Sequence, residues 1–187
     1  LSIHAPVIGA HQILNIAPAV LVAHHVDMTF KKIIDACSTL PITTNGFKIY
    51  HFGDATIIDD SYNSNPRGFR AALEVLGSFP SKQPRVVITR GMLELGERSQ
   101  EIHETLAEEI AFYADTLVII TPDAANFLET GAGRLKDKYR LEIRRCFESG
   151  ELKQYLEELK KTNSVILLEN RIPIDLYNFV SQTYYSV

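Results

Sequence analysis

Three short apolar runs, each followed by a segment with helical apolar spacing, most constrain the fold of this chain. They are "RVVIT" (85–89), "TLVII" (116–120) and "SVILLE" (164–169). Continuous apolar runs, without polar alternation, are typical of strands buried on both faces of a parallel sheet. Strands that alternate with amphipathic helices predict a Rossmann-like α/β fold, with a mostly parallel sheet and helices on both faces.

One edge of this sheet is predicted to be antiparallel. The segment "FKIYHF" (47–52) alternates in polarity, as a partly exposed strand does, and "ATIIDD" (55–60) follows after Gly53 and Asp54. A glycine and an aspartate between two such runs favour a tight hairpin turn. The first strand of the hairpin is therefore expected at the edge.

The first part of the chain has a different pattern. A strongly apolar helical stretch is predicted from about 11 to 25, and a shorter helix after Thr29. "LPITTNG" (40–46) has the composition of a turn or loop. We therefore expect a small helical segment at 1–44 and an α/β domain at 45–187.

Composition excludes several classes of protein. The net charge of −4 and the scattered basic residues argue against nucleic acid as a partner. Cys37 and Cys146 lie far apart and form no metal-binding spacing, which favours a reducing, cytoplasmic location. No apolar run approaches the roughly 20 residues that a membrane span requires.

Polar side chains gather where the second strand of the hairpin meets the next helix, in "DDSYNSNP" (59–66). Ligands of open parallel sheets bind where strands end and helices begin. The helix expected at Pro66 would offer free N–H groups and its positive dipole end to a phosphate or carboxylate. The alternative is that these residues only form caps and turns, as Asp, Asn and Ser commonly do.

This segment resembles the D-x-Y-N-x-N-P motif of the Mur ligase family, and three other segments resemble family motifs in the same order. "GAHQILNIAPAVLVA" (9–23) is similar to the G-x-H-x-x-x-N-x-x-A helix that closes the central ATPase domain. "RGMLELGERSQEIH" (90–103) is similar to the G-M-x-E-L-G-E loop, and "SVILLENRIP" (164–173) to the last-strand segment of one sub-branch. The resemblance covers nearly the whole chain and is strongest to the branch that adds D-alanyl-D-alanine.

The resemblance implies ATP-dependent amide formation through an acyl phosphate in peptidoglycan precursor synthesis. ATP and Mg²⁺ would be the cofactors, and a UDP-N-acetylmuramoyl peptide and D-alanyl-D-alanine the substrates. In the family a P-loop, a magnesium-binding Glu and a carbamylated Lys lie upstream, whereas no G-x-x-x-x-G-K-[ST] occurs in these 187 residues. We therefore expect residues 1–44 to be the tail of the central domain, the partners to include the N-terminal and central domains, and this fragment alone to be inactive. We expect no metal ligand and no confidently catalytic residue in it.

Site residues follow from the matched motifs. Asn15 matches the adenine-contacting asparagine, and Asp60 the aspartate that holds the ribose. The nucleotide and phosphate side would be lined by Tyr62, Asn63 and Asn65.

Other motif residues have less direct roles. His11 matches a motif histidine, for which a supporting role is expected. Arg90 and Glu94 are candidates for contact with the incoming amine substrate, with a plain structured loop as the alternative. His103 is expected to be a partly exposed structural residue.

The sequence departs from the family at three places and leaves rival interpretations open. An arginine usual before the edge strand is absent from "TTNGFK", "TRGM" replaces L-G-D-M or T-P-G-M, and "LENRIP" replaces K-G-S-R. The first bears on nucleotide affinity and the others on the identity of the amine. The rivals are a related ligase with another acceptor, such as a folylpolyglutamate-type enzyme, and a non-catalytic Rossmann-like module that binds a nucleotide or a partner protein.

Overall fold

The computed structural model describes residues 2–7, 12–40, 47–62 and 64–181. Contacts divide the chain into two compact units, Leu1–Gly46 and Phe47–Val187. The boundary expected between residues 44 and 45 falls outside the described residues. The first unit contains helices α1 (Ile13–His25) and α2 (Phe30–Ser38). As predicted, Thr29 caps α2, because its side chain accepts a hydrogen bond from the N–H of Lys32.

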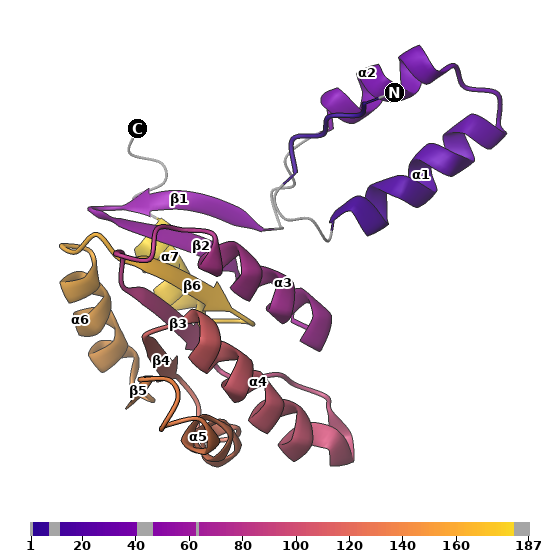
Figure 1. Ribbon diagram of the computed structural model, residues 1–187. Helices are drawn as coiled ribbons and strands as arrows, with labels where there is room; N and C mark the ends of the chain where they lie inside the picture. Colours follow the sequence, from indigo (N-terminus) through magenta and orange to yellow (C-terminus); the bar gives the residue numbers. More distant parts are fainter. Residues whose placement is uncertain (1, 8–11, 41–46, 63, 182–187) are drawn as a thin grey trace. The chain divides into compact units, whose positions relative to one another are not determined.

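The second unit alternates strands and helices along its length (Figure 1). Its strands are β1 (Lys48–Phe52), β2 (Ala55–Asp60), β3 (Arg85–Thr89), β4 (Thr116–Ile119), β5 (Glu142–Arg145) and β6 (Val165–Glu169). Its helices are α3 (Pro66–Gly77), a short 3₁₀ turn η2 (Gly96–Arg98), α4 (Ser99–Tyr113), α5 (Ala125–Arg134), α6 (Ser149–Leu159) and α7 (Ile174–Ser181).

The six strands form one sheet in the order β1-β2-β6-β3-β4-β5. The pair β1–β2 is antiparallel and every other pair is parallel, which confirms the predicted α/β fold class. The last strand of the chain, β6, is inserted between β2 and β3. The chain turns to one face of the sheet after β2 and β3 and to the other after β6, so β6 marks the topological switch point, where ligands of such sheets bind.

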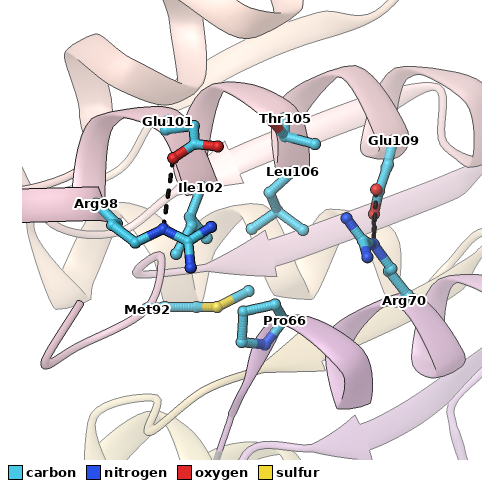
Figure 2. Close-up of a pocket in the computed structure, with 9 residues that line it drawn as sticks. All are labelled: Pro66, Arg70, Met92, Arg98, Glu101, Ile102, Thr105, Leu106 and Glu109. Atoms are coloured by element: carbon cyan, nitrogen blue, oxygen red, sulfur yellow. Dashed lines mark hydrogen bonds and ion pairs between the residues drawn. The ribbon is translucent and has the colours of Figure 1, made fainter.

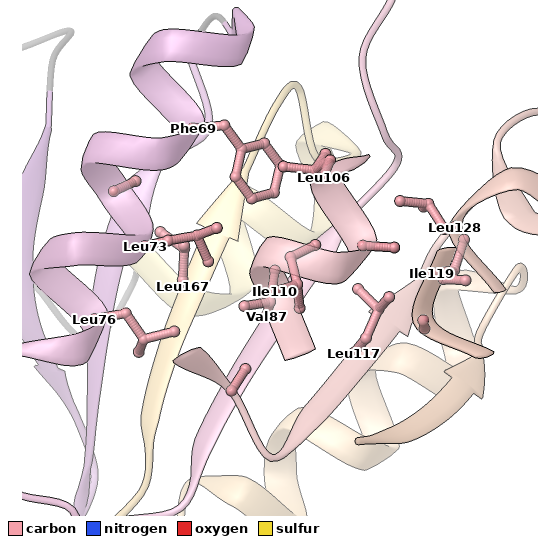
Figure 3. Close-up of a cluster of buried hydrophobic side chains, with 14 of the residues drawn as sticks. Phe69, Leu73, Leu76, Val87, Leu106, Ile110, Leu117, Ile119, Leu128 and Leu167 are labelled. Atoms are coloured by element: carbon pink, nitrogen blue, oxygen red, sulfur yellow. The ribbon is translucent and has the colours of Figure 1, made fainter. Parts of the chain in front are cut away.

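Each face of the sheet has its own hydrophobic core. Helices α3, α4 and α5 cover one face, and Figure 3 shows their side chains meeting those of the strands: Phe69, Leu73, Leu76, Leu106, Ile110 and Leu128 from the helices, with Val87, Leu117, Ile119 and Leu167 from the sheet. Helices α6 and α7 cover the other face through Leu152, Leu156, Leu159, Leu176 and Val180. The residues of β3, β4 and β6 are buried on both sides almost throughout, which explains why these three sequences do not alternate in polarity.

Helix α5 approaches α4 closely at a glycine. A Cβ at Gly131 would lie 2.6 Å from the Cα of Glu104 and closer still to its carbonyl oxygen, whereas a Cβ at Gly133, on the same helix, would meet nothing within 4 Å. The missing side chain at 131 therefore permits the contact between the two helices.

We predict that Gly131→Ala lowers the free energy of unfolding by about 1–3 kcal/mol, because the helix backbones must move apart. Gly133→Ala is the matched control and should raise it by up to about 1 kcal/mol, since alanine is the better helix former. Urea unfolding of the two variants measures the difference. Equal effects at both positions would contradict the close contact.

Candidate functional site

Three polar side chains lie side by side at the carboxyl ends of the central strands. Glu169 ends β6, and its register partners are Asp60 on β2 and Thr89 on β3. Alternation along each strand directs all three toward the face that α3 and α4 cover, as it does for Ile58, Val87 and Leu167 two residues earlier. Glu169 is fully buried. The site thus coincides with the topological switch point.

The carboxyl of Glu169 is only partly satisfied by donors. Ser64 donates its hydroxyl to Glu169 Oε1 at 2.6 Å. No donor among the described residues reaches Glu169 Oε2. Burial, followed by the neighbouring carboxyl of Asp60, raises the pKa of Glu169 well above its ordinary value. A protonated Glu169 that donates to Asp60 satisfies both groups, and a buried unpaired charge is thereby avoided.

Asp60 is also affected by its position. Burial raises the pKa of Asp60 to about 6, with a smaller upward contribution from Asp59, while the hydrogen bond with Glu169 opposes the shift. Asp59 itself is engaged locally, since its Oδ1 accepts hydrogen bonds from the backbone N–H of Ser61 at 3.1 Å and from the Ser61 hydroxyl at 2.5 Å. Of the two adjacent aspartates, Asp60 is therefore the one whose carboxylate remains able to contact a ligand.

The residues after β6 bind both neighbouring strand ends. Asn170 donates its side-chain amide to the carbonyl oxygen of Gly91, after β3. Arg171 donates its backbone N–H to the carbonyl oxygen of Ser61, after β2, at 2.7 Å. Both residues have a positive φ, 59° and 34°, and asparagine tolerates this backbone conformation well. The segment Glu169–Arg171 thus fixes the edge of the site.

Glu169, Asn170 and Ser64 were not among the predicted site residues. A signal was present in "SVILLENRIP", where an acid and an amide directly end a fully apolar strand. Their importance depends on β6 lying between β2 and β3, and the strand order cannot be read from one strand.

The helix after the site is not open to an anion in the way that the sequence suggested. Asn65 caps α3, because its Oδ1 accepts the N–H groups of Arg67 at 3.1 Å and Gly68 at 2.9 Å. Pro66 has no N–H, and the N–H of Phe69 already donates to the backbone oxygen of Asn65 at 3.0 Å. The expectation of free N–H groups at this helix start is therefore wrong, and the capping role holds. The amide nitrogen of Asn65 has no hydrogen-bond partner among the described residues and stays a candidate ligand donor.

The other nucleotide-side candidates have different surroundings. Tyr62 is exposed at 69% and follows the strand end directly. Asn15 belongs to the first unit, where it donates its amide to Gln12 Oε1 at 2.9 Å. Asn63 and His11 lie outside the described residues.

The two amine-side candidates lie in the loop after β3. Arg90 is half-buried, and its Nε has no partner among the described residues. Glu94 is exposed, with a φ of 61°. His103, which we expected to be partly exposed, is buried at 1% exposure, so that expectation is wrong. His103 is the first buried residue of α4, and its ring contacts the backbone of the loop after β3 at Met92.

A pocket of about 280 Å³ opens between α3 and α4 (Figure 2). Met92, Ile102 and Leu106 supply its apolar lining. Arg70 and Arg98 flank it, and each binds a glutamate of α4 through Nε, Glu109 at 2.7 Å and Glu101 at 3.4 Å. Because each arginine is matched by a carboxylate, the pocket carries no fixed net charge from these four groups.

The described part of the chain contains no group of three His, Cys, Asp or Glu side chains placed to hold a metal ion. None of the described helices has the length and apolar character needed to cross a membrane.

The fold and the polar strand ends define a doubly wound α/β domain whose ligand site is expected at the tip of β6. Residues 47–169 match the family model described as "Mur ligase, glutamate ligase domain". The chain belongs to the Mur ligase family, whose members are ATP-dependent amide ligases.

A relative from Bacillus subtilis, named UDP-N-acetylmuramoyl-tripeptide–D-alanyl-D-alanine ligase, is 22% identical over 165 residues. This alignment covers 88% of the present chain and 36% of the relative, so the chain spans about a third of that protein. A relative of the same name from Escherichia coli is 27% identical, over 68% of this chain and 28% of its own length.

Solved structures of the family share the fold. MurF ligase from Thermotoga maritima, in complex with ADP, aligns with a TM-score of 0.70 and 25% identity, covering 88% of this chain and 36% of that one. MurC from the same organism aligns with a TM-score of 0.71 at 18% identity, covering 100% of this chain and 41% of that one. Fold similarity therefore extends across members with different substrates.

We predict that Glu169→Gln becomes progressively more stabilising, relative to the wild type, as pH rises from about 5 to about 8. Both carboxyl pKa values are raised in the folded state. The wild-type pair therefore stabilises the fold fully below about pH 4, the unfolded pKa, and loses that contribution as pH rises through the folded values, about 6 for Asp60. Glutamine keeps the acceptor for Ser64 and a donor for Asp60 without a titrating proton.

At about pH 8 the gain should be about 1 kcal/mol, measured by urea unfolding. Glu169→Ala is the comparison variant and should lose about 2–3 kcal/mol, because it leaves the Ser64 hydroxyl unpaired and a cavity beside it. A difference between Glu169→Gln and the wild type that does not change with pH would show that the pair does not titrate as described.

Proposed function

We propose that this chain is the C-terminal part of an ATP-dependent ligase that adds D-alanyl-D-alanine to a UDP-N-acetylmuramoyl peptide. Family membership supports the amide-ligase chemistry. The names of the relatives from B. subtilis and E. coli support the amine. The observation that carries the proposal within the structure is the Asp60–Glu169 carboxyl pair at the topological switch point.

Asp60 is proposed to bind the ribose of the nucleotide. A carboxylate can accept hydrogen bonds from vicinal hydroxyl groups, and Glu169 orients Asp60 from inside the fold. The exposed ring of Tyr62 and the amide nitrogen of Asn65, which has no hydrogen-bond partner among the described residues, are proposed to line the nucleotide. The bound ADP of the T. maritima relative supports nucleotide binding in this family.

The remaining roles follow from the matched motifs. Asn15 and Asn63 are proposed nucleotide contacts, and Arg90 and Glu94 proposed contacts of the amine substrate. ATP with magnesium supplies the phosphoryl group that activates the substrate carboxylate. The proposed role of this chain is to orient the nucleotide and the amine and to exclude water when the domains close. Neither the P-loop motif nor a metal-binding group occurs in the described residues, so turnover by these 187 residues alone is not expected.

The decisive experiment is an amine screen with the complete gene product that contains these residues. ADP release should depend on both the UDP-N-acetylmuramoyl tripeptide and D-alanyl-D-alanine, and mass spectrometry should detect the amide product. Reactions that lack either substrate are the controls. Release that depends on another amine, such as a glutamyl acceptor, would favour a relative with a different specificity, and the absence of any amine-dependent release would favour a non-catalytic module.

We predict that Asp60→Asn in the complete gene product raises the KM for ATP about tenfold, because an uncharged amide accepts hydrogen bonds more weakly than a carboxylate. The KM for the amine should change less than about twofold. Asp137→Asn is the matched control, since Asp137 is exposed in the turn before β5, at the opposite edge of the sheet. Steady-state ADP release measures both constants, and an unchanged ATP dependence in Asp60→Asn would contradict the ribose assignment.

A further inference from the structure

The base of the loop after β3 (residues 90–96) has its backbone groups held by four side chains. Thr89 Oγ1 accepts the N–H of Gly91 at 3.0 Å, and Asn170 donates to the Gly91 oxygen. Thr121 donates to the oxygen of Arg90 at 3.1 Å. The N–H of Met92 donates to Nε2 of His103 at 2.9 Å. The last contact is the one nearest to the exposed tip, Leu93 and Glu94.

The Ser99 carbonyl and the Met92 N–H determine the tautomer of His103, and the Ser99 hydroxyl also lies 3.2 Å from Nδ1. Nδ1 lies 2.7 Å from the carbonyl oxygen of Ser99, which can only accept, so Nδ1 carries the proton. The N–H of Met92 can only donate, so Nε2 offers a lone pair. The ring is therefore neutral, with both nitrogens engaged.

The loop backbone lies against this ring. A Cβ at Gly91 would come within 2.6 Å of His103 Nε2 and of the Ala124 side chain, and Gly91 has a φ of 81°. The ring of Phe127 from α5 stacks 6.3 Å away, centroid to centroid. Very little room remains for the loop to shift toward α4 while the ring is in place.

We propose that His103 is a positioning residue: its neutral imidazole holds the Met92 amide and thereby fixes the Leu93–Glu94 tip for contact with the amine substrate. The proposal rests on the proposed ligase function for its catalytic consequence. Met92 extends the effect, because its buried side chain also lines the pocket between α3 and α4.

Acid should release this loop. Burial lowers the pKa of His103, and the Ser99 carbonyl opposes the shift only partly. Glu104, next on α4, is paired with Arg134 of α5, and neither charge contributes to the pKa of His103. A proton on Nε2 would face the N–H of Met92, so protonation and the loop contact exclude each other.

The first test is NMR spectroscopy on the 187-residue chain. The Met92 amide should be protected from hydrogen exchange in the wild type and should exchange at least about tenfold faster in His103→Ala. His103→Gln should restore protection, since its Oε1 reaches the position of Nε2, whereas the shorter His103→Asn should not. His51→Gln, at an exposed site on β1, is the matched control and should leave Met92 unchanged. Equal protection in the wild type and in a folded His103→Asn would overturn the proposal.

The second test is kinetic and uses the complete gene product. His103→Asn should lower kcat/KM for the amine about tenfold and leave the KM for ATP within about twofold, and His103→Gln should recover kcat/KM. The acid limb of the pH profile should move in both variants, because neither side chain titrates. Equal loss in Asn and Gln variants would overturn the positioning role. If the wild type shows no amine-dependent ADP release, the proposed function fails. The role of His103 in holding the loop is still supported in that case if the Met92 amide loses its protection in His103→Asn and keeps it in His103→Gln.

Discussion

The site depends on one topological constraint, the insertion of β6 between β2 and β3. Strands β2 and β3 do not pair with each other, and each pairs with β6. Glu169 and Asn170, at the end of β6, are therefore the residues that connect the polar turn after β2 with the loop after β3. Without the last strand, the two proposed halves of the site, for the nucleotide and for the amine, would have no common support.

The elements themselves could largely be predicted from the sequence, because each depends on local patterns. The hairpin at Gly53 and Asp54 and the helix start at Pro66, capped by Asn65, both lie where turn and capping chemistry indicated. The resemblance to the Mur ligase family likewise rests on local sequence motifs, and the match over residues 47–169 confirms it.

The contacts within the site could not be predicted in the same way, because they join residues that are distant in sequence. Ser64 and Glu169 are separated by 105 positions, and Asn170 and Gly91 by 79. The burial of His103 has the same origin: its exposure depends on how closely the loop after β3 approaches α4, which the helical pattern of α4 alone does not reveal. Asn65 shows a related limit of sequence analysis. The sequence allowed Asn65 either to cap α3 or to border an open anion site, and only the positions of the N–H groups that its Oδ1 accepts distinguish the two roles.

These contacts also bear on the source of positive charge in the proposed reaction. Phosphoryl transfer requires cations near the transferring group. At the strand ends the described chain offers two carboxyls that share a site and a helix start whose N–H groups are used by its own cap. Arg90 and Arg171, which follow β3 and β6, form no ion pair within the described residues. The carboxyls can orient a ribose or an amine, which needs hydrogen-bond acceptors, and any positive charge from this edge depends on those two arginines. The acidic character of this edge comes from Asp60 and Glu169, so the further cations that phosphoryl transfer requires are expected from groups outside the described residues.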